Sequence, residues 1–242
     1  ATVRSPGERS TRTVWFRPLR RLRERARGLC IRRRQIYVVN FDSAPARVYW
    51  EITRACDLAC RHCRAEATPT APPGELTPAE GRQLLDRIAS FGTPPPHIVL
   101  TGGDPLKRAD LFDLIAYAQS KGLAVSVSPS GTPLLTVDAI KRLKAAGIDA
   151  ISLSIDGASA GPHDALRGVP GTFERTMQSA RTASEVGLMF QVNTLVSQET
   201  LGELPAIARL VSELHAARWS LFFLVTVGRG TVLQPIDAAT CE

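Results

Sequence analysis

The sequence predicts an α/β fold, a (β/α)6 partial TIM barrel, and three observations carry this prediction. From about residue 36 onward, short apolar segments alternate with amphipathic helical segments, which is the pattern of parallel β/α units. Glycines and small polar residues gather where the predicted strands end. The remaining length of about 207 residues is less than the roughly 250 of an eight-stranded barrel. A doubly wound sheet also fits the alternation, but a single polar rim favours a six-stranded partial barrel.

The first 35 residues differ in composition from the rest of the chain. They hold twelve arginines and two glutamates, whereas the remainder holds 18 basic and 21 acidic side chains, a net charge of −3. We expect residues 1–35 to be a basic, disordered leader; a nucleic-acid or membrane-surface arm is the alternative. The mildly acidic remainder argues against a nucleic-acid partner. The predicted domains are the leader at 1–35, a core at 36–235 and the start of a truncated C-terminal region at 236–242.

The first half of the core is predicted from local patterns. Strands are expected at 48–53 and 98–100, joined through an irregular proline-rich connector at 68–74. Thr77 and Glu80 form a capping box with Pro78 at the first helical position. The apolar face of the helix that follows consists of Leu84, Leu85, Ile88 and Phe91. The apolar face of the next helix consists of Leu111, Leu114, Ile115 and Ala118.

The second half of the core continues the alternation. Further strands are expected at 123–127, 150–155, 189–195 and 219–225, and further helices at 137–146, 173–186 and 201–214. The core then has six strands and five helices. The large aromatic residues expected in the hydrophobic core are Trp50, Trp219, Phe222 and Phe223.

Three cysteines with the spacing C-x3-C-x2-C, namely Cys56, Cys60 and Cys63, directly follow the first predicted strand. Three thiolates cannot complete a tetrahedral structural zinc site, whereas a cubane iron–sulphur cluster on three cysteines keeps one iron open for a reagent. The alternatives are a zinc knuckle that uses His62 or a distant cysteine, and three unrelated buried thiols. No membrane-spanning run and no secretory signal is visible, so we expect a reducing, cytoplasmic location.

The other candidate residues follow the later strands. Gly102, Gly103, Asp104 and Pro105 come after the second strand, and the two glycines allow the backbone to approach a ligand closely. The remaining members of this predicted rim are Ser128, Ser130, Ser154, Asp156, Asn193 and the stretch 228–230.

The cysteine spacing after a first strand resembles the signature of the radical S-adenosylmethionine (SAM) enzymes, and Gly102-Gly103-Asp104-Pro105 resembles their Gly-Gly-Glu-Pro motif. The resemblance implies a [4Fe-4S] cluster on Cys56, Cys60 and Cys63, with SAM chelating the open iron. It further implies reductive cleavage of SAM to a 5′-deoxyadenosyl radical that abstracts hydrogen from a substrate. An electron donor such as flavodoxin or ferredoxin is then an expected partner.

The same resemblance assigns roles to individual residues. The backbone of residues 102–105 is expected to bind the SAM amino group, with Asp104 where the family usually has glutamate. Residues 152–168 resemble the family's S-x-D-G…H-D-x-x-R-G run, in which the serine and arginine hold the SAM carboxylate and ribose. Within or near this run, the expected SAM contacts are Ser154, Asp156, Arg167 and Asn193. His62 stands where the family usually has an aromatic residue that packs on the adenine. Ser128 and Ser130 occupy the place of the family's Thr-x-Asn-Gly turn. The alternative is that these residues have structural or surface roles only.

Within the superfamily, the chain looks most like the branch with a cysteine-rich C-terminal extension, the SPASM domain. That branch contains peptide maturases and haem-biosynthesis enzymes that decarboxylate or remodel iron porphyrins, and the stretches 41–45 and 227–230 resemble the haem group. A tetrapyrrole or a peptide is therefore the expected substrate, and a non-catalytic iron–sulphur binding module is the alternative function. The chain ends at Glu242 without a cysteine-rich extension, which leads us to expect a truncated product.

Overall fold

The structure, a computed structural model, describes residues 44–241 and contains one sheet with the strand order β1-β2-β3-β4-β5-β6. The strands are β1 (Arg47–Thr53), β2 (His97–Gly102), β3 (Val125–Val127), β4 (Ala150–Ser154), β5 (Met189–Val196) and β6 (Arg218–Phe223). Every neighbouring pair is parallel. Within the described residues, β1 and β6 each pair on one side only, so the sheet is open and the predicted six-stranded partial barrel is confirmed. The predicted leader at 1–35 lies outside the described residues.

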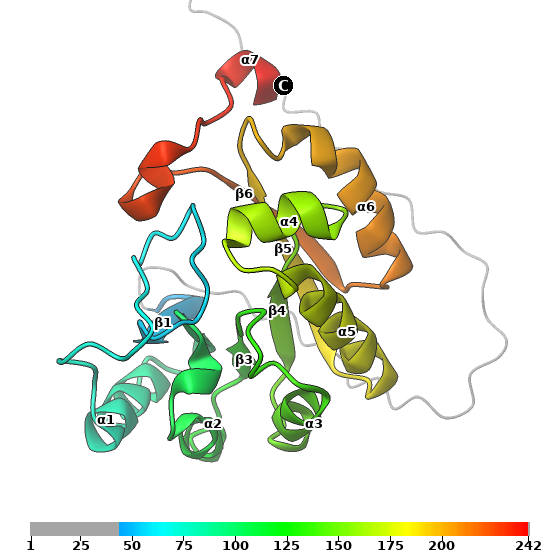
Figure 1. Cartoon of the computed structure of the whole chain (residues 1–242). Helices are drawn as coiled ribbons and strands as arrows, with labels where there is room; N and C mark the ends of the chain where they lie inside the picture. Colours follow the sequence, from blue (N-terminus) through cyan, green and yellow to red (C-terminus); the bar gives the residue numbers. More distant parts are fainter. Residues whose placement is uncertain (1–43, 242) are drawn as a thin grey trace, which may run out of the picture. The chain divides into compact units, whose positions relative to one another are not determined.

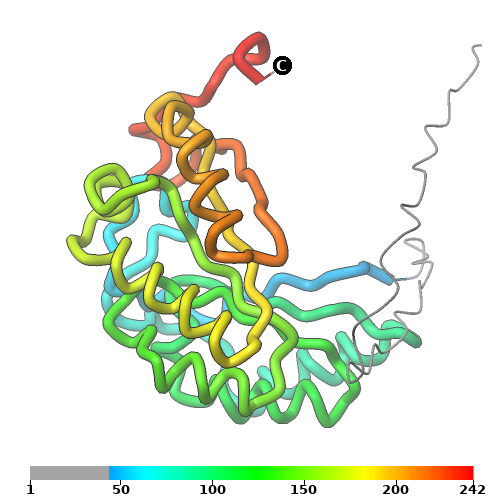
Figure 2. The backbone as a smooth tube through the Cα atoms, turned by 90° about the vertical axis from the view of Figure 1, so that its right-hand side faces the viewer, coloured from blue at the N-terminus to red at the C-terminus, as the bar shows by residue number. Residues whose placement is uncertain are grey.

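Helices cover one face of this sheet in an arc (Figures 1 and 2). The arc consists of α1 (Pro78–Ala89), α2 (Leu111–Ser120), α3 (Val137–Ala145), α5 (Thr172–Glu185) and α6 (Leu204–Glu213). Outside it lie α4 (Ala160–Arg167), the short α7 (Ala238–Cys241) and the 3-10 turns η1 (Pro105–Lys107), η2 (Leu201–Glu203) and η3 (Gly228–Val232). The main core lies between the arc and the sheet and is almost entirely aliphatic, with fully buried residues such as Leu85, Leu100, Leu114, Ile140 and Ile151. No helix among residues 44–241 has the length and apolar character needed to cross a membrane.

The capping box at the start of α1 forms as predicted. The Thr77 hydroxyl accepts a hydrogen bond from Glu80 N at 3.3 Å, and the Glu80 carboxylate accepts one from Thr77 N at 2.8 Å. Pro78 occupies the first turn, where a missing N–H costs no intrahelical hydrogen bond. Local sequence therefore fixes where α1 begins and how the irregular connector before it enters the helix.

The structure differs from the sequence-based expectation at three places. Helix α1 ends at Ala89 with Ser90 as its cap, so Phe91 lies outside the helix and is 46% exposed. Helix α4 was not predicted and stands between β4 and α5. Phe222 and Phe223 are each 53% exposed instead of buried, because β6 pairs only with β5 within residues 44–241. Trp50 is buried and Trp219 packs half-buried against the core, as expected.

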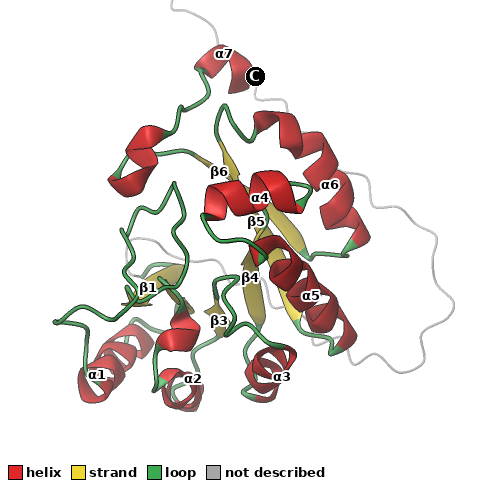
Figure 3. Cartoon of the chain, in the orientation of Figure 1, coloured by secondary structure: helices red, strands yellow, loops and turns green. Residues whose placement is uncertain are grey.

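The carboxyl ends of the strands carry the long irregular loops, which Figure 3 shows in green around one end of the sheet. The loop between β1 and α1 has no regular helix or strand of its own. It contains the cysteine loop, which we define as residues 54–68. This loop, the β2 and β3 turns, α4 and η3 thus meet at the same rim.

Candidate functional site

The cysteine loop is closed at its base by its own backbone. Cys56 N donates to Thr68 O at 2.8 Å, and Thr68 N donates to Arg54 O at 3.1 Å. Cys56 and Cys60 are buried, Cys63 is half-buried, and all three are free thiols. The loop therefore presents three thiols from a segment whose two ends are fixed to each other.

Two of the three thiol sulphurs accept hydrogen bonds from the backbone of their own loop. Leu58 N donates to the Cys56 sulphur and Ala67 N donates to the Cys63 sulphur, each at 3.4 Å. Burial raises the pKa of the Cys56 thiol, so a bound cation is needed to hold it as a thiolate near neutral pH. Three free thiols on one loop, with buried polar atoms nearby that lack partners among the described residues, are a donor set that fits an iron–sulphur group.

The two glycines after β2 lie directly against the start of the cysteine loop. Gly103 N donates to Thr53 O and Asp104 N donates to Ala55 O, both at 2.7 Å. A Cβ at Gly103 would lie 2.4 Å from Ala55 O, and one at Gly102, whose φ is +130°, would lie 2.2 Å from Thr53 O. Only glycine fits at these two positions, because any side chain would separate the turn from the loop.

The Asp104 carboxylate links the β2 turn to the β3 turn. Asp104 is fully buried and accepts hydrogen bonds from Leu106 N at 3.2 Å, Ser130 N at 3.3 Å and the Thr132 hydroxyl at 2.5 Å. Burial raises the pKa of the Asp104 carboxyl, while these three donors act in the opposite direction. The Asp104 side chain is therefore occupied inside the protein by donors from the β2 and β3 turns.

Ser130 connects three parts of the predicted site. Its hydroxyl donates to Gly103 O at 2.7 Å and lies 3.7 Å from the Cys56 sulphur. Ser128 is half-buried at the end of β3, where its N–H donates to Leu100 O at 2.9 Å. The structure therefore brings Ser130 next to the cysteine loop and leaves Ser128 on the adjoining rim.

Ser154 and Asn193 lie side by side on neighbouring strands. They pair in register across β4 and β5, and Asn193 pairs in turn with Ser220 of β6. Both residues are half-buried, and the Asn193 side-chain oxygen accepts a hydrogen bond from Gln191 at 3.0 Å. Ser154, Asn193 and Ser220 thus form a row of small polar residues across three neighbouring strands.

Asp156 and Arg167 form a buried ion pair, with side chains only 1% and 13% exposed. The other Asp156 oxygen accepts a hydrogen bond from Leu195 N at 2.7 Å. Burial acts against the charged carboxylate, but the Arg167 guanidinium outweighs it and holds the pKa of Asp156 below its ordinary value. Arg167 Nη1 lies 3.8 Å from the Cys60 sulphur, and Arg167 Nε is buried without a partner among the described residues. Arg167 is thus aimed at the cysteine loop, with Asp156 behind it.

Two histidines flank this ion pair. His163 is fully buried, and its Nδ1 accepts a hydrogen bond from Asp156 N at 3.2 Å. Burial, assisted by the charge of Arg167, lowers the pKa of both His62 and His163 to about 4. His62 is therefore neutral near pH 7, and its Nδ1 is buried without a partner in the described part of the chain. A neutral imidazole is compatible with the expected stacking on an adenine.

Sequence reasoning missed two residues of this region. His163 was part of a motif but had no assigned role. Arg229 follows β6, yet its Nε donates to Cys60 O at 3.0 Å, across 169 residues of sequence. The only sequence feature that could have indicated a role for Arg229 was the Gly-Arg-Gly run directly after the last strand. That run does not indicate which residues the arginine would contact.

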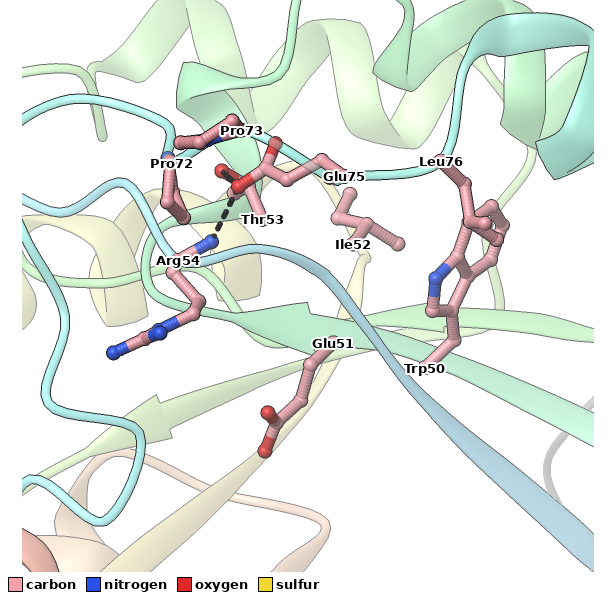
Figure 4. Close-up of a pocket in the computed structure, with 10 residues that line it drawn as sticks. Trp50, Glu51, Ile52, Thr53, Arg54, Pro72, Pro73, Glu75 and Leu76 are labelled. Atoms are coloured by element: carbon pink, nitrogen blue, oxygen red, sulfur yellow. Dashed lines mark hydrogen bonds between the residues drawn. The ribbon is translucent and has the colours of Figure 1, made fainter.

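An open cavity of about 310 Å³ lies beside the site, between β1 and the proline-rich connector (Figure 4). Glu75 lines it and accepts hydrogen bonds from the Thr53 hydroxyl and from Arg54 N, each at 2.8 Å. None of the predicted cluster or SAM residues lines this cavity. It is therefore distinct from the rim that carries the thiols.

Comparison with known proteins matches these features to one family. The sequence model of the Radical SAM superfamily matches residues 50–211. An AdoMet-dependent heme synthase from Nitratidesulfovibrio vulgaris is 44% identical, over 81% of this chain and 53% of that protein. A second AdoMet-dependent heme synthase, from Methanosarcina barkeri, is 40% identical over 85% of this chain and 58% of that protein. The chain thus spans about half the length of the curated relatives it matches.

Solved structures show the same fold. The structure of Streptococcus suis SuiB bound to S-adenosylmethionine has a TM-score of 0.69 at 17% identity and covers 81% of this chain and 44% of that one. Native anSMEcpe with bound AdoMet has a TM-score of 0.62 at 16% identity, over 74% of this chain and 51% of that one. From its match to the family over most of the described core, the chain belongs to the radical SAM superfamily, whose enzymes use a [4Fe-4S] cluster together with S-adenosylmethionine.

Proposed function

We propose that this chain is the catalytic core of a radical SAM enzyme of haem biosynthesis, acting on an iron porphyrin. The identities of 44% and 40% to proteins named AdoMet-dependent heme synthase support this assignment. The observation that carries it is the meeting of the three thiols, the Gly102-Gly103 turn and Arg167 at one rim.

In this proposal, Cys56, Cys60 and Cys63 hold the cluster. The carbonyl groups of the 102–105 turn accept hydrogen bonds from the SAM amino group. Asp104 acts from behind the turn, because its carboxylate is used up by donors from the β2 and β3 turns. Ser130 steadies the same turn through its hydrogen bond to Gly103 O.

The opposite side of the SAM site comes from β4, β5 and α4. Ser154 and Asn193, adjacent across two strands, present polar groups to the SAM carboxylate and ribose. Arg167 supplies a positive charge that Asp156 keeps oriented. Neutral His62 lies beneath the adenine, and Ser128 adds a hydroxyl to the same rim.

When bound, the cluster and SAM supply a one-electron cleavage whose radical abstracts hydrogen from the substrate. The chain's own contribution is to bind both, to hold them against each other and to limit access of water. The electron would come from a donor such as flavodoxin or ferredoxin. Because free thiols and a reduced cluster need a reducing compartment, we infer a cytoplasmic location.

The test is anaerobic reconstitution with iron and sulphide, followed by addition of dithionite, SAM and iron coproporphyrin III. We expect 5′-deoxyadenosine and a decarboxylated porphyrin by chromatography and mass spectrometry. Cys60→Ala should abolish both products, whereas Cys241→Ala, which changes an exposed thiol in α7, should leave both unchanged. Deoxyadenosine without a change in the porphyrin would refute the proposed substrate and retain the SAM chemistry.

A peptide is the second candidate substrate. Two similarities support it. A mycofactocin maturase from Mycobacterium tuberculosis is 29% identical over 78% of this chain, and a PqqA peptide cyclase from Rhizobium meliloti is 32% identical over 72% of it. Both identities are lower than those to the heme synthases. A peptide-dependent increase in deoxyadenosine would favour this alternative, and a cluster without any SAM cleavage would favour a binding module.

A further inference from the structure

The segment that follows β6 contacts the cysteine loop through a single arginine. Arg229 N donates to Cys63 O at 3.1 Å, Arg229 Nε donates to Cys60 O at 3.0 Å, and Arg229 Nη1 donates to Ala67 O at 3.3 Å. Three carbonyls between residues 60 and 67 of the loop are therefore held by one residue. We refer to residues 228–230 as the clasp.

The close approach of the clasp depends on glycine. Gly228 has a φ of +52°, and a Cβ there would lie 2.8 Å from both Cys63 O and Arg64 O. Gly230 is buried at the other end of the clasp, where a Cβ would lie 3.3 Å from Val225 O and 3.7 Å from the Cα of His62, an ordinary contact distance. Gly228 is thus the glycine that allows the backbone to lie against the loop while the arginine reaches over it.

The clasp joins two parts of the fold that the sheet leaves apart. The cysteine loop follows β1 and the clasp follows β6, and these two strands do not pair with each other in the described residues. Figure 1 shows η3, which contains the clasp, beside the cyan cysteine loop. One backbone and two side-chain hydrogen bonds from Arg229 therefore link the segments that follow the two edge strands at the rim.

The arginine also has a donor that nothing in the described structure uses. Arg229 Nη2 is buried and has no partner among the described residues. A guanidinium remains charged at any physiological pH, and buried donors without a partner call for a ligand. The cluster expected here carries a net negative charge once its three thiolate ligands are counted, and Arg229 holds the carbonyls of two of these cysteines, Cys60 and Cys63.

We propose that Arg229 is a positioning residue for the cluster site. It holds residues 60–67 in the conformation that binds the cluster, and its fixed positive charge favours the reduced form of the cluster. The first half of the proposal, the conformation of residues 60–67, concerns the protein alone. The second half, the effect of the Arg229 charge on the reduced cluster, rests on the proposed function because it requires a bound redox group.

The first half is tested on the iron-free 242-residue chain by amide hydrogen exchange of residues 60–67. Arg229→Gln removes the charge and part of the hydrogen bonding, and it should speed exchange there by about tenfold. Arg209→Gln removes a positive charge from the exposed face of α6 and is the matched control. Gly228→Ala keeps the arginine but forces the clasp away, and it should speed exchange in the same residues. Wild-type exchange in both Arg229→Gln and Gly228→Ala would overturn the positioning role.

The second half is tested by an anaerobic redox titration of the reconstituted cluster, monitored by electron paramagnetic resonance. Removing a nearby positive charge disfavours the more negative, reduced state. Arg229→Gln should therefore shift the reduction equilibrium by about tenfold toward the oxidised cluster, or 59 mV for one electron. Arg229→Lys should retain more of the wild-type potential than Arg229→Gln, because it keeps the charge.

The outcomes separate this inference from the proposed function. An Arg229→Gln potential equal to that of the wild type and of Arg209→Gln would overturn the electrostatic role. Failure of SAM cleavage in every variant, wild type included, would refute the proposed function without altering the exchange result. Faster exchange with an unchanged potential would support the clasp and reject the charge effect.

Discussion

The Nη1 atom of Arg167 lies 3.8 Å from the sulphur of Cys60, at the point where α4 ends against the cysteine loop. The contact is reinforced by the backbone, because Arg61 N donates to Leu166 O at 2.9 Å. On its other side, Arg167 pairs with Asp156, which is anchored to Leu195 N. The thiol is therefore linked through one guanidinium to the ends of β4 and β5, and this linkage leads to the first prediction.

Asp156→Asn should destabilise the protein by about 3 kcal/mol or more, because it leaves the buried Arg167 guanidinium without its counter-charge. The free energy of unfolding in urea measures the effect on the iron-free protein. Arg61→Gln breaks the Arg61–Glu199 pair, whose side chains are 42% and 40% exposed, and should cost less than about 1 kcal/mol. The double variant Asp156→Asn, Arg167→Met should regain part of the loss. Equal destabilisation by Asp156→Asn and Arg61→Gln would contradict the importance of burial here.

Asp104→Asn should destabilise the link between the β2 and β3 turns by about 1–3 kcal/mol. An amide has only one acceptor oxygen, so at least one of Leu106 N, Ser130 N and the Thr132 hydroxyl loses its acceptor and faces an amide NH2 instead, in a fully buried place. Thermal unfolding of the iron-free protein gives the size of the effect. Thr132→Val removes one donor of the same cluster, and the two changes should be strongly non-additive in a double-mutant cycle. Simple additivity would count against a shared network.

Gly103→Ala should prevent normal packing of the β2 turn on the cysteine loop. The added Cβ would lie 2.4 Å from Ala55 O, which is backbone and cannot rotate away. We expect a loss of at least about 2 kcal/mol in unfolding free energy and a marked loss of iron bound after reconstitution. Gly161→Ala is the control: it lies in α4 with nothing within 4 Å of the new Cβ. It should stabilise the protein by about 0.5–1 kcal/mol. Full iron binding by Gly103→Ala would show that the turn tolerates displacement.

The stability of the iron-free protein should fall as the pH decreases from about 6.5 to about 4, in part through His163. Burial, together with Arg167, lowers the pKa of His163 from 6.5 to about 4, with Asp156 and Asp164 opposing the shift. The unfolded state therefore binds a proton in this range that the folded state does not. The contribution of His163 is fully present above pH 6.5 and is lost toward pH 4, by a total of roughly 3 kcal/mol.

The measurement is urea unfolding at a series of pH values for the wild type and His163→Gln. The variant should show a shallower decrease of stability between pH 6.5 and 4, while His62 keeps contributing in both proteins. Superimposable slopes for His163→Gln and the wild type would show that His163 does not bind its proton in this range.

Much of the fold could be predicted from local sequence. Strand and helix positions follow from apolar periodicity, and the Thr77–Glu80 capping box marks the start of α1 because capping involves residues three apart. The wrong predictions concern residues whose burial depends on contacts with distant parts of the chain. Phe222 and Phe223 look like core residues, yet they lie on β6, which has no second strand beside it in the described residues. No local pattern indicates that a strand is at an edge.

The candidate site divides in the same way. The cysteine spacing and the Gly102-Gly103 turn are short-range patterns, and the sequence by itself determined that the thiols lie on one loop and that the polar residues follow successive parallel strands. Only the tertiary structure decided that the Asp104 and Asp156 carboxylates point inward, to Thr132 and Arg167, and that Arg229 reaches Cys60. The physical reason is distance along the chain. Such contacts depend on how the whole sheet curves, and neither periodicity nor spacing carries that information.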